Sequence, residues 1–229
     1  MNCFMRAACA GLMTVASATT VPALAADFPL GPYSEPAVAS PAFTWSGFYA
    51  GLNAGYSWAT TTWSGAGSDT FGINGWFGGG TAGYNFQNGV WVWGLEGDID
   101  YTGIKGADAN VGGACGGLAG GCETRNSWLA TTRGRIGFGW NHWMPFLTGG
   151  AAFGDIKMTP DGGGTQSTTT AGWAAGAGFE YRFLGPWSAK VEYLYVDLGK
   201  ATCGAPTCAA DTAVSFKTNL LRAGVNYRF

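Results

Sequence analysis

The sequence predicts an all-β protein, an eight-stranded antiparallel transmembrane β-barrel, and three observations support this prediction. Large apolar or aromatic residues alternate with small or polar ones in eight segments from residue 45 to the end of the chain. This two-residue period is typical of a strand with unlike faces. Aromatic residues gather at the segment ends, and the connections alternate between long and short, as in barrels that cross a membrane with strands.

The composition excludes several other classes of protein. The 229 residues include 40 glycines and only 11% charged residues, whereas average proteins have roughly 7% glycine and about 25% charged residues. A hydrophobic content of 47% excludes a disordered chain, and no run of about 18 uncharged apolar residues is present for a membrane-spanning helix. The net charge of −2 comes without a basic run, so no nucleic-acid partner is expected.

Residues 1–25 are expected to be a secretory signal peptide, cleaved near Ala25. Arg6 supplies the positive start, residues 7–15 a short apolar segment, and Ala23-Leu24-Ala25 the small-x-small cleavage pattern. The apolar segment is too short to anchor the chain across a membrane.

Residues 26–44 contain four prolines and little periodicity, which predicts an extended periplasmic linker. No role is assigned to it. The barrel domain is expected to occupy residues 45–229.

The first three strand segments separate their two faces clearly. In residues 47–58, the even positions carry aromatic and aliphatic residues, and the odd positions carry mostly Gly, Asn and Ser. Residues 76–86 form the second segment, and Asn88-Gly89 after it is a strong hairpin signal. In residues 91–101, three acids lie on the face opposite the aromatic residues.

The remaining segments follow the same rule. In the fourth, residues 128–140, Arg133 and Arg135 lie on the non-aromatic face. The last four strands are expected near 145–155, 171–183, 187–198 and 213–229.

The apolar face of each strand is expected to contact lipid. The predicted lipid-facing residues are Phe48, Leu52, Trp76, Tyr84, Leu95, Ile136, Phe138, Phe179, Val191, Tyr193 and Val225.

Long extracellular loops are expected to alternate with short periplasmic turns. The pattern predicts long connections at 59–71, 102–124, 157–170 and 199–212, and short ones at 87–89, 141–144 and 184–186.

The cysteines that remain after signal cleavage form two close pairs in long connections. Cys115 lies near Cys122, and Cys203 lies near Cys208. An exported chain meets an oxidising compartment, and neither the spacing nor a nearby histidine favours zinc. Loop disulfides are therefore the favoured interpretation, with metal binding as the alternative.

Four stretches carry a resemblance to a known family: residues 45–51 (WSGFYAG), 94–98 (GLEGD), 189–195 (AKVEYLY) and the last eight residues. They resemble the small outer-membrane β-barrel proteins of Gram-negative bacteria, the opacity-protein-like surface antigens often grouped as a porin family. The resemblance implies a barrel in the cell outer membrane with both chain termini in the periplasm. The expected partners are outer-membrane lipid, lipopolysaccharide and the outer-membrane assembly machinery.

The end of the chain resembles the signal that this assembly machinery reads. A polar residue is followed by Gly, an aromatic residue and a terminal Phe, which here are Arg222, Gly224, Tyr227 and Phe229.

The strand face opposite the aromatic residues carries acids and bases in nearly equal numbers. Because isolated charges are costly in low dielectric, ion pairs are expected across a narrow lumen. The interior of an eight-stranded barrel is just wide enough for side chains to fill, so a general-diffusion pore is not expected. The predicted lumen charge network is Glu96, Asp98, Asp100, Arg133, Arg135, Glu180, Arg182, Lys190, Glu192 and Arg222.

No active site is predicted. Residues 78–83 fit a dinucleotide-binding pattern, but they continue as a strand where that motif would open a helix. His142, the single histidine, falls in an expected short turn. The chain is therefore predicted to be no enzyme, with no catalytic residue, cofactor or metal.

The predicted function is structural: the barrel contributes to envelope integrity and displays surface loops as a surface antigen. Two alternatives stay open, a narrow porin-like channel for small solutes or ions and an adhesin or ligand-binding barrel that acts through its loops. The sequence does not predict a specific ligand or an oligomeric state.

Overall fold

The computed structural model describes residues 44–64, 68–108, 121–160, 164–205, 207–208 and 212–229. The predicted signal peptide and, apart from Thr44, the predicted linker lie outside the described residues. Eight strands run through the described part: β1 (Gly47–Ser64), β2 (Ser68–Asn88), β3 (Trp91–Asp108), β4 (Cys122–Phe138), β5 (Trp143–Pro160), β6 (Gln166–Leu184), β7 (Trp187–Cys203) and β8 (Thr212–Arg228).

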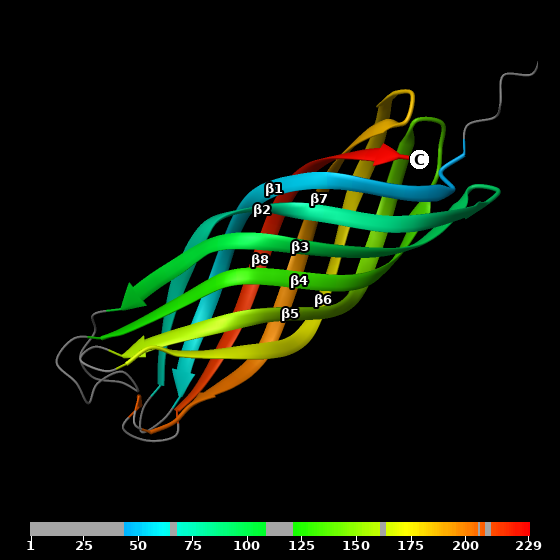
Figure 1. Ribbon diagram of the computed structural model, residues 1–229. Coiled ribbons are helices and arrows are strands. Elements are labelled where there is room, and N and C mark those ends of the chain that lie inside the picture. Colours follow the sequence, from blue (N-terminus) through cyan, green and yellow to red (C-terminus); the bar gives the residue numbers. More distant parts are fainter. Residues whose placement is uncertain (1–43, 65–67, 109–120, 161–163, 206, 209–211) are drawn as a thin grey trace, which may run out of the picture. The chain divides into compact units, whose positions relative to one another are not determined.

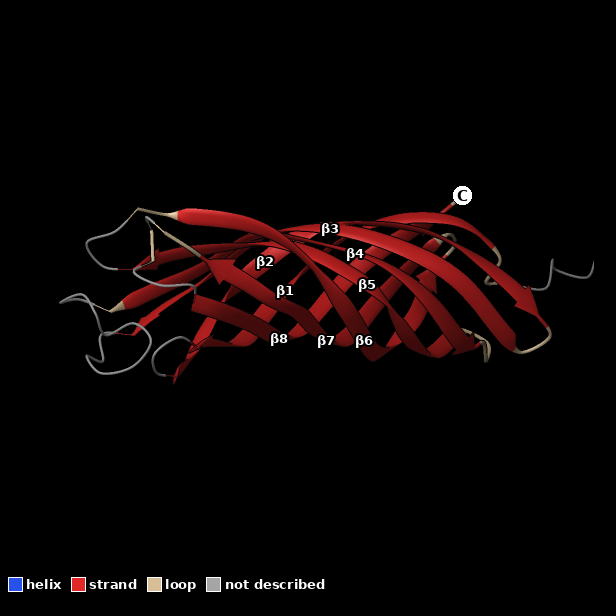
Figure 2. Ribbon diagram, turned by 90° about the horizontal axis from the view of Figure 1, so that it is seen from below, coloured by secondary structure: helices blue, strands red, loops and turns tan. Residues whose placement is uncertain are grey.

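The strands form a closed antiparallel barrel, which confirms the predicted fold class (Figure 1). Each strand pairs with its neighbours in the chain, and β1 closes the barrel against β8 over Tyr49 to Ser64. Figure 2 shows the strands lying obliquely to the barrel axis, as closure of a sheet requires. In the described part of the chain, no helix has the length and apolar character needed to cross a membrane.

The barrel has two distinct ends. At one, which we call the turn end, three short connections join the strands, and each has one residue with left-handed φ: Gly89 (61°), Asn141 (52°) and Gly185 (50°). The last residue, Phe229, also lies there, where its amide donates to the Phe48 carbonyl at 3.0 Å. The other end, which we call the loop end, holds the four hairpin connections that follow β1, β3, β5 and β7.

The predicted loop boundaries were wrong, because the strands continue into residues assigned to loops. β1 and β2 pair as far as Ser64 with Ser68, and β3 pairs with β4 as far as Asp108 with Cys122. Beyond the aromatic residues the outward positions become polar, as at Thr60. The apolar alternation that marks a strand in lipid is therefore lost, although the backbone pairing continues.

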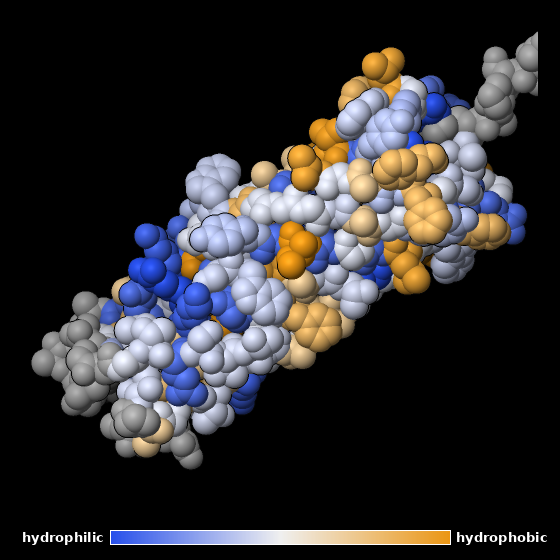
Figure 3. All heavy atoms as spheres, viewed as in Figure 1, coloured by the Kyte–Doolittle hydropathy of each residue, from blue (hydrophilic) through white to orange (hydrophobic). Residues whose placement is uncertain are grey.

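The outer face of the barrel is apolar over most of its length. Ten of the eleven predicted lipid-facing residues are exposed, and Ile136 is half-buried on the same face. Aromatic side chains contact one another near the turn end, as in Trp187 with Tyr227 (ring centroids 5.0 Å apart), and nearer the loop end, as in Tyr56 with Trp76 (5.0 Å). In Figure 3 the most hydrophilic side chains gather toward the loop end.

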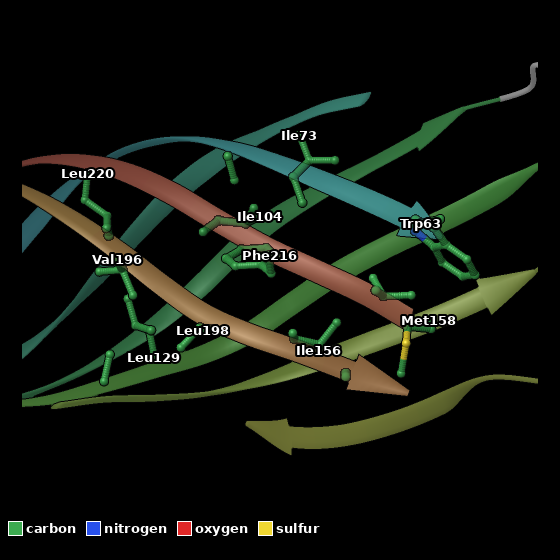
Figure 4. Packing of buried hydrophobic residues seen from close by; sticks show 14 of the residues in the cluster. Trp63, Ile73, Ile104, Leu129, Ile156, Met158, Val196, Leu198, Phe216 and Leu220 are labelled. Carbon is green, nitrogen blue, oxygen red and sulfur yellow. The ribbon is translucent and has the colours of Figure 1, made fainter. Parts of the chain in front are cut away.

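The interior contains a hydrophobic core toward the loop end, which we call the apolar tier (Figure 4). Inward side chains from the strands fill it, and the largest are almost completely buried, including Trp63, Ile156 and Phe216. Its members are Ala59, Trp63, Ile73, Phe77, Ile104, Cys122, Leu129, Ala152, Ile156, Met158, Ala174, Leu194, Val196, Leu198, Ala201, Cys203, Cys208, Val214, Phe216 and Leu220.

Candidate functional site in the barrel lumen

Between the apolar tier and the turn end, the lumen contains a layer of buried charges, which we call the charged belt. Strands β3, β4, β6, β7 and β8 supply it, because the inward positions of these strands carry acids and bases at one level. The belt comprises five carboxylates and four cations: Glu96, Asp98, Asp100, Glu180, Glu192, Arg133, Arg135, Lys190 and Arg222.

Arg133 connects β4 to the neighbouring strand β3 and, across the lumen, to β7. It lies directly opposite Glu96 in the β3–β4 register, and its Nη2 is 2.6 Å from Glu96 Oε1 and 2.8 Å from Asp98 Oδ2. Across the lumen, its Nη1 is 2.6 Å from Glu192 Oε1 on β7. The Nε atom donates to the Thr131 hydroxyl at 2.7 Å. One guanidinium therefore contacts three carboxylates.

Arg222 holds β8 to the same group of acids. Its Nε donates to Glu192 Oε2 at 2.6 Å, and its Nη1 lies 3.0 Å from Asp98 Oδ1 and 3.5 Å from Asp100 Oδ2. Planar guanidinium groups suit such multidentate contacts with carboxylates. Asp98 and Glu192 are thus each shared between two arginines.

Lys190 crosses the barrel from β7 to β3. Its Nζ lies 2.7 Å from Glu96 Oε2 and 4.0 Å from Glu192 Oε2. Because Glu96 also forms an ion pair with Arg133, it connects β3, β4 and β7 in one network.

Arg135 extends the network toward the turn end. Its Nη2 lies 2.8 Å from Glu180 Oε2 on β6, and its Nη1 donates to the Tyr49 hydroxyl at 3.1 Å. Tyr49 in turn donates to Glu96 Oε2 at 2.8 Å. A Cβ at position 83 would meet the Tyr49 ring and hydroxyl, so the glycine there makes room for this tyrosine.

The belt residues are removed from water. Arg133 and Lys190 are 1% exposed and Glu192 is 0% exposed. Charges buried this deeply persist only with partners and additional hydrogen bonds, and every belt carboxylate and cation lies within 4.0 Å of an opposite charge. The arrangement can hold opposite walls of the barrel together.

Two basic residues of the same strand face lie outside the belt. Arg182 was expected in the network, but it is only half-buried, and its Nε donates to the Gly185 carbonyl in the β6–β7 turn. The strand ends at Leu184, so Arg182 lies beyond the level of the acids. Arg228 is similarly placed at the turn end, where its Nη1 donates to the Thr44 carbonyl at 2.8 Å.

The residues of the predicted assembly signal lie along β8 and just after it. Arg222 faces the lumen, whereas Tyr227 and Phe229 are exposed on the outside. The two aromatic rings contact each other in an edge arrangement, 5.2 Å between centroids. Gly224 lies opposite Asn53 of β1 and Lys190 of β7.

One of the two predicted cysteine pairs falls within the described residues. Cys203 and Cys208 are joined by a disulfide that closes the connection after β7, and both are buried beside the apolar tier. Cys122 is buried at the start of β4. Its predicted partner Cys115 lies outside the described residues, so the predicted Cys115–Cys122 pair lies outside them as well.

Sequence reasoning missed Tyr49 and the apolar tier. Tyr49 shares its strand face with small and polar residues, and an aromatic residue on that face was a signal for the lumen. The alternation of side chains along the last strand also carried a signal for the apolar tier, because Val214, Phe216 and Leu220 lie on the same face as Arg222.

Comparison with known proteins identifies the family. The family model described as outer membrane protein beta-barrel domain matches residues 11–229. The chain belongs to this family. It is therefore an outer-membrane β-barrel protein.

Curated relatives match nearly the whole chain. The 31 kDa outer-membrane immunogenic protein of Brucella melitensis biotype 1 is 34% identical over 241 residues, covering 95% of this chain and 98% of the relative. The 25 kDa outer-membrane immunogenic protein of Brucella abortus biovar 1 is 31% identical, covering 86% of this chain and 85% of the relative. The 22 kDa outer membrane protein of Rhizobium leguminosarum bv. viciae is 34% identical, covering 72% of this chain and 69% of the relative.

Among solved structures, Neisserial surface protein A matches with a TM-score of 0.47 and 17% sequence identity. The match covers 80% of this chain and 98% of that protein.

Proposed function

We propose that the protein is a closed structural barrel that contributes to the integrity of the outer membrane and presents its loop end at the cell surface. The turn end, which holds Phe229, would face the periplasm. The proposed role is not enzymatic. The names of the Brucella relatives, outer-membrane immunogenic proteins, support the display of a surface antigen.

The burial of the lumen side chains carries this proposal. A continuous water-filled passage would leave the side chains that line it accessible to water. Instead Arg133, Lys190 and Arg222 are at most 2% exposed, although they reach across the interior. A packed lumen at this level favours a structural role over a pore, consistent with the narrow interior of eight-stranded barrels.

The apolar tier adds a second obstacle in series with the first. Trp63, Ile156 and Phe216 are at most 1% exposed, and an ion that passed the belt would then meet a packed, largely hydrophobic layer. Transfer of an unpaired ion into such a layer is strongly unfavourable. This layer would have to open before a narrow channel could conduct.

The test is the conductance of the refolded, heat-modifiable protein in a planar lipid bilayer, with the Arg133→Ala variant beside it. We expect neither protein to produce discrete channels, because the apolar tier stays intact in the variant. Discrete channels in the wild-type protein whose conductance changes in Arg133→Ala would contradict the proposal and favour a channel.

The envelope role has its own test. A strain that lacks the protein should become more sensitive to detergents and large antibiotics, and the wild-type gene should restore resistance. Unchanged sensitivity would count against a contribution to envelope integrity.

A further inference from the structure

A group of cations on the outer face near the loop end has an unusual arrangement. Lys105 on β3 lies directly opposite Arg125 on β4, and Arg125 lies directly opposite Lys157 on β5. The three side chains point outward, because their neighbours Ile104, Thr124 and Ile156 are buried in the lumen. We call Lys105, Arg125 and Lys157 the cationic patch.

Opposed like charges disfavour strand pairing, so a bound anion would stabilise this arrangement. Two acids already reduce the repulsion between the cations: Glu123 Oε1 contacts Arg125 Nε, and Asp155 Oδ2 lies 3.7 Å from Lys157 Nζ. Asp155 is already engaged through Oδ1, which accepts from the amides of Ser127 and Trp128 at 2.7 and 3.0 Å. Three cations against two acids leave an excess positive charge on this face.

Among the described residues of β7 and β8, no two cations lie directly opposite each other, and the exposed Lys200 lies opposite Ser215. On β7 and β8, Lys217 lies directly opposite Asp197 in the register, and Lys217 Nζ is 3.6 Å from Asp197 Oδ2. Opposed unlike charges favour pairing. The row of directly opposed cations therefore belongs to one side of the barrel, formed by β3, β4 and β5.

The height of the patch relates it to the membrane surface. Tyr101, which is 77% exposed, lies four residues before Lys105 on β3, and Phe153 lies four residues before Lys157 on β5. Exposed aromatic residues mark the interface of a barrel with lipid. Four residues of strand span about 13 Å along the strand, less along the tilted barrel axis, which places the patch at the level of lipid headgroups. Figure 3 shows hydrophilic side chains gathered on the outer face toward this end.

We propose that the cationic patch binds the phosphate groups of an outer-leaflet saccharolipid, the lipid A part of lipopolysaccharide. Arg125 offers a planar group suited to bidentate phosphate contacts, and the two lysines act as point charges on either side. The aromatic and aliphatic outer surface below the patch receives the acyl chains. The site lies on the outer face, so it does not depend on whether the lumen conducts.

The experiment is a titration of the refolded protein in zwitterionic detergent with diphosphoryl lipid A, followed by the tryptophan fluorescence of the barrel. Two double variants remove the same number of charges at the loop end: Lys105→Gln with Arg125→Gln, and Lys200→Gln with Lys217→Gln. We expect the first to bind about tenfold or more weakly than the wild-type protein, because charge-assisted contacts are lost. The second should bind like the wild-type protein.

Four outcomes would overturn the proposal: wild-type affinity in the patch variant, equal losses in both variants, equal binding of dephosphorylated lipid A, or displacement of the lipid by millimolar inorganic phosphate. Heat-modifiable mobility in gel electrophoresis checks that both double variants fold. If the Lys105→Gln, Arg125→Gln variant does not fold, the single variant Lys105→Gln is titrated in its place. Since conductance is measured separately, loss of the lipid site leaves the proposed closed barrel unaffected.

Discussion

The charged belt and the apolar tier line the same lumen but have opposite chemistry. On β8, Arg222 belongs to the belt, whereas Phe216, six residues nearer the loop end and on the same face, belongs to the tier. The outward face of β8 changes in the opposite sense, from the exposed Val225 at the level of the belt to Ser215 and Lys217 beside the tier.

The same exchange occurs along β1. Asn53 faces inward and Leu52 outward in the half near the turn end, whereas Trp63 faces inward and Thr62 outward in the other half. A barrel in lipid needs an apolar exterior, while a barrel in water needs an apolar interior. One set of strands therefore satisfies both solvents by exchanging the chemistry of its two faces at the membrane boundary.

The largest expected effect comes from the belt. Replacing Arg222 by Ala leaves Glu192, Asp98 and Asp100 buried with fewer partners, and we expect the free energy of unfolding to fall by about 3–5 kcal/mol. Denaturant unfolding of the protein in lipid vesicles measures this loss. The control is Arg125→Ala on the exposed outer face, expected to change stability by no more than about 0.5 kcal/mol. Equal losses in the two variants would contradict the belt's role.

The next effect comes from the tier, where two adjacent leucines provide a matched pair. Leu220 is completely buried in the lumen, whereas Leu221 is 46% exposed on the outer face. Leu220→Ala should lower the free energy of unfolding by about 2–5 kcal/mol, because it leaves a cavity. Leu221→Ala should cost less, because lipid chains fill the space. A larger loss for Leu221→Ala would show that the tier is not a packed core.

The smallest effect concerns the disulfide beside the tier. Breaking the Cys203–Cys208 bond by the double substitution Cys203→Ser and Cys208→Ser should lower stability by about 2 kcal/mol, because the closed loop is short. Denaturant unfolding under oxidising conditions measures the difference. Under reducing conditions the wild-type protein should lose most of this advantage over the variant. Identical stability of the wild-type protein and the double variant under oxidising conditions would contradict the prediction.

Much of the fold and the belt follows from strand parity. The two-residue period places Arg133 and Arg135 on one face of the fourth strand. In the third strand it places Glu96 on the face opposite that of Leu95. Antiparallel pairing of consecutive strands then brings Arg133 beside Glu96. These steps need only the alternation of side chains along a strand.

Other features could not be predicted because they depend on where the strands end and where lipid gives way to water. Outward Thr60 and Thr62 resemble loop residues when an apolar exterior is expected along the whole strand. Arg182 has the parity of Glu180, but its level at the end of β6 is set by the turn and by the register shift after it. Parity gives the face of a residue, whereas its height in the barrel depends on the register.

The most direct test of the exchange between the two levels is a pair of outward substitutions on β1, Leu52→Arg and Thr62→Arg, followed by denaturant unfolding in lipid vesicles. Leu52 is 75% exposed on the outer face. We expect Leu52→Arg to lower the free energy of unfolding by about 2–4 kcal/mol and Thr62→Arg by about 0–1 kcal/mol, because only the first arginine enters hydrocarbon. Equal losses at the two positions, or a larger loss at Thr62, would contradict this exchange.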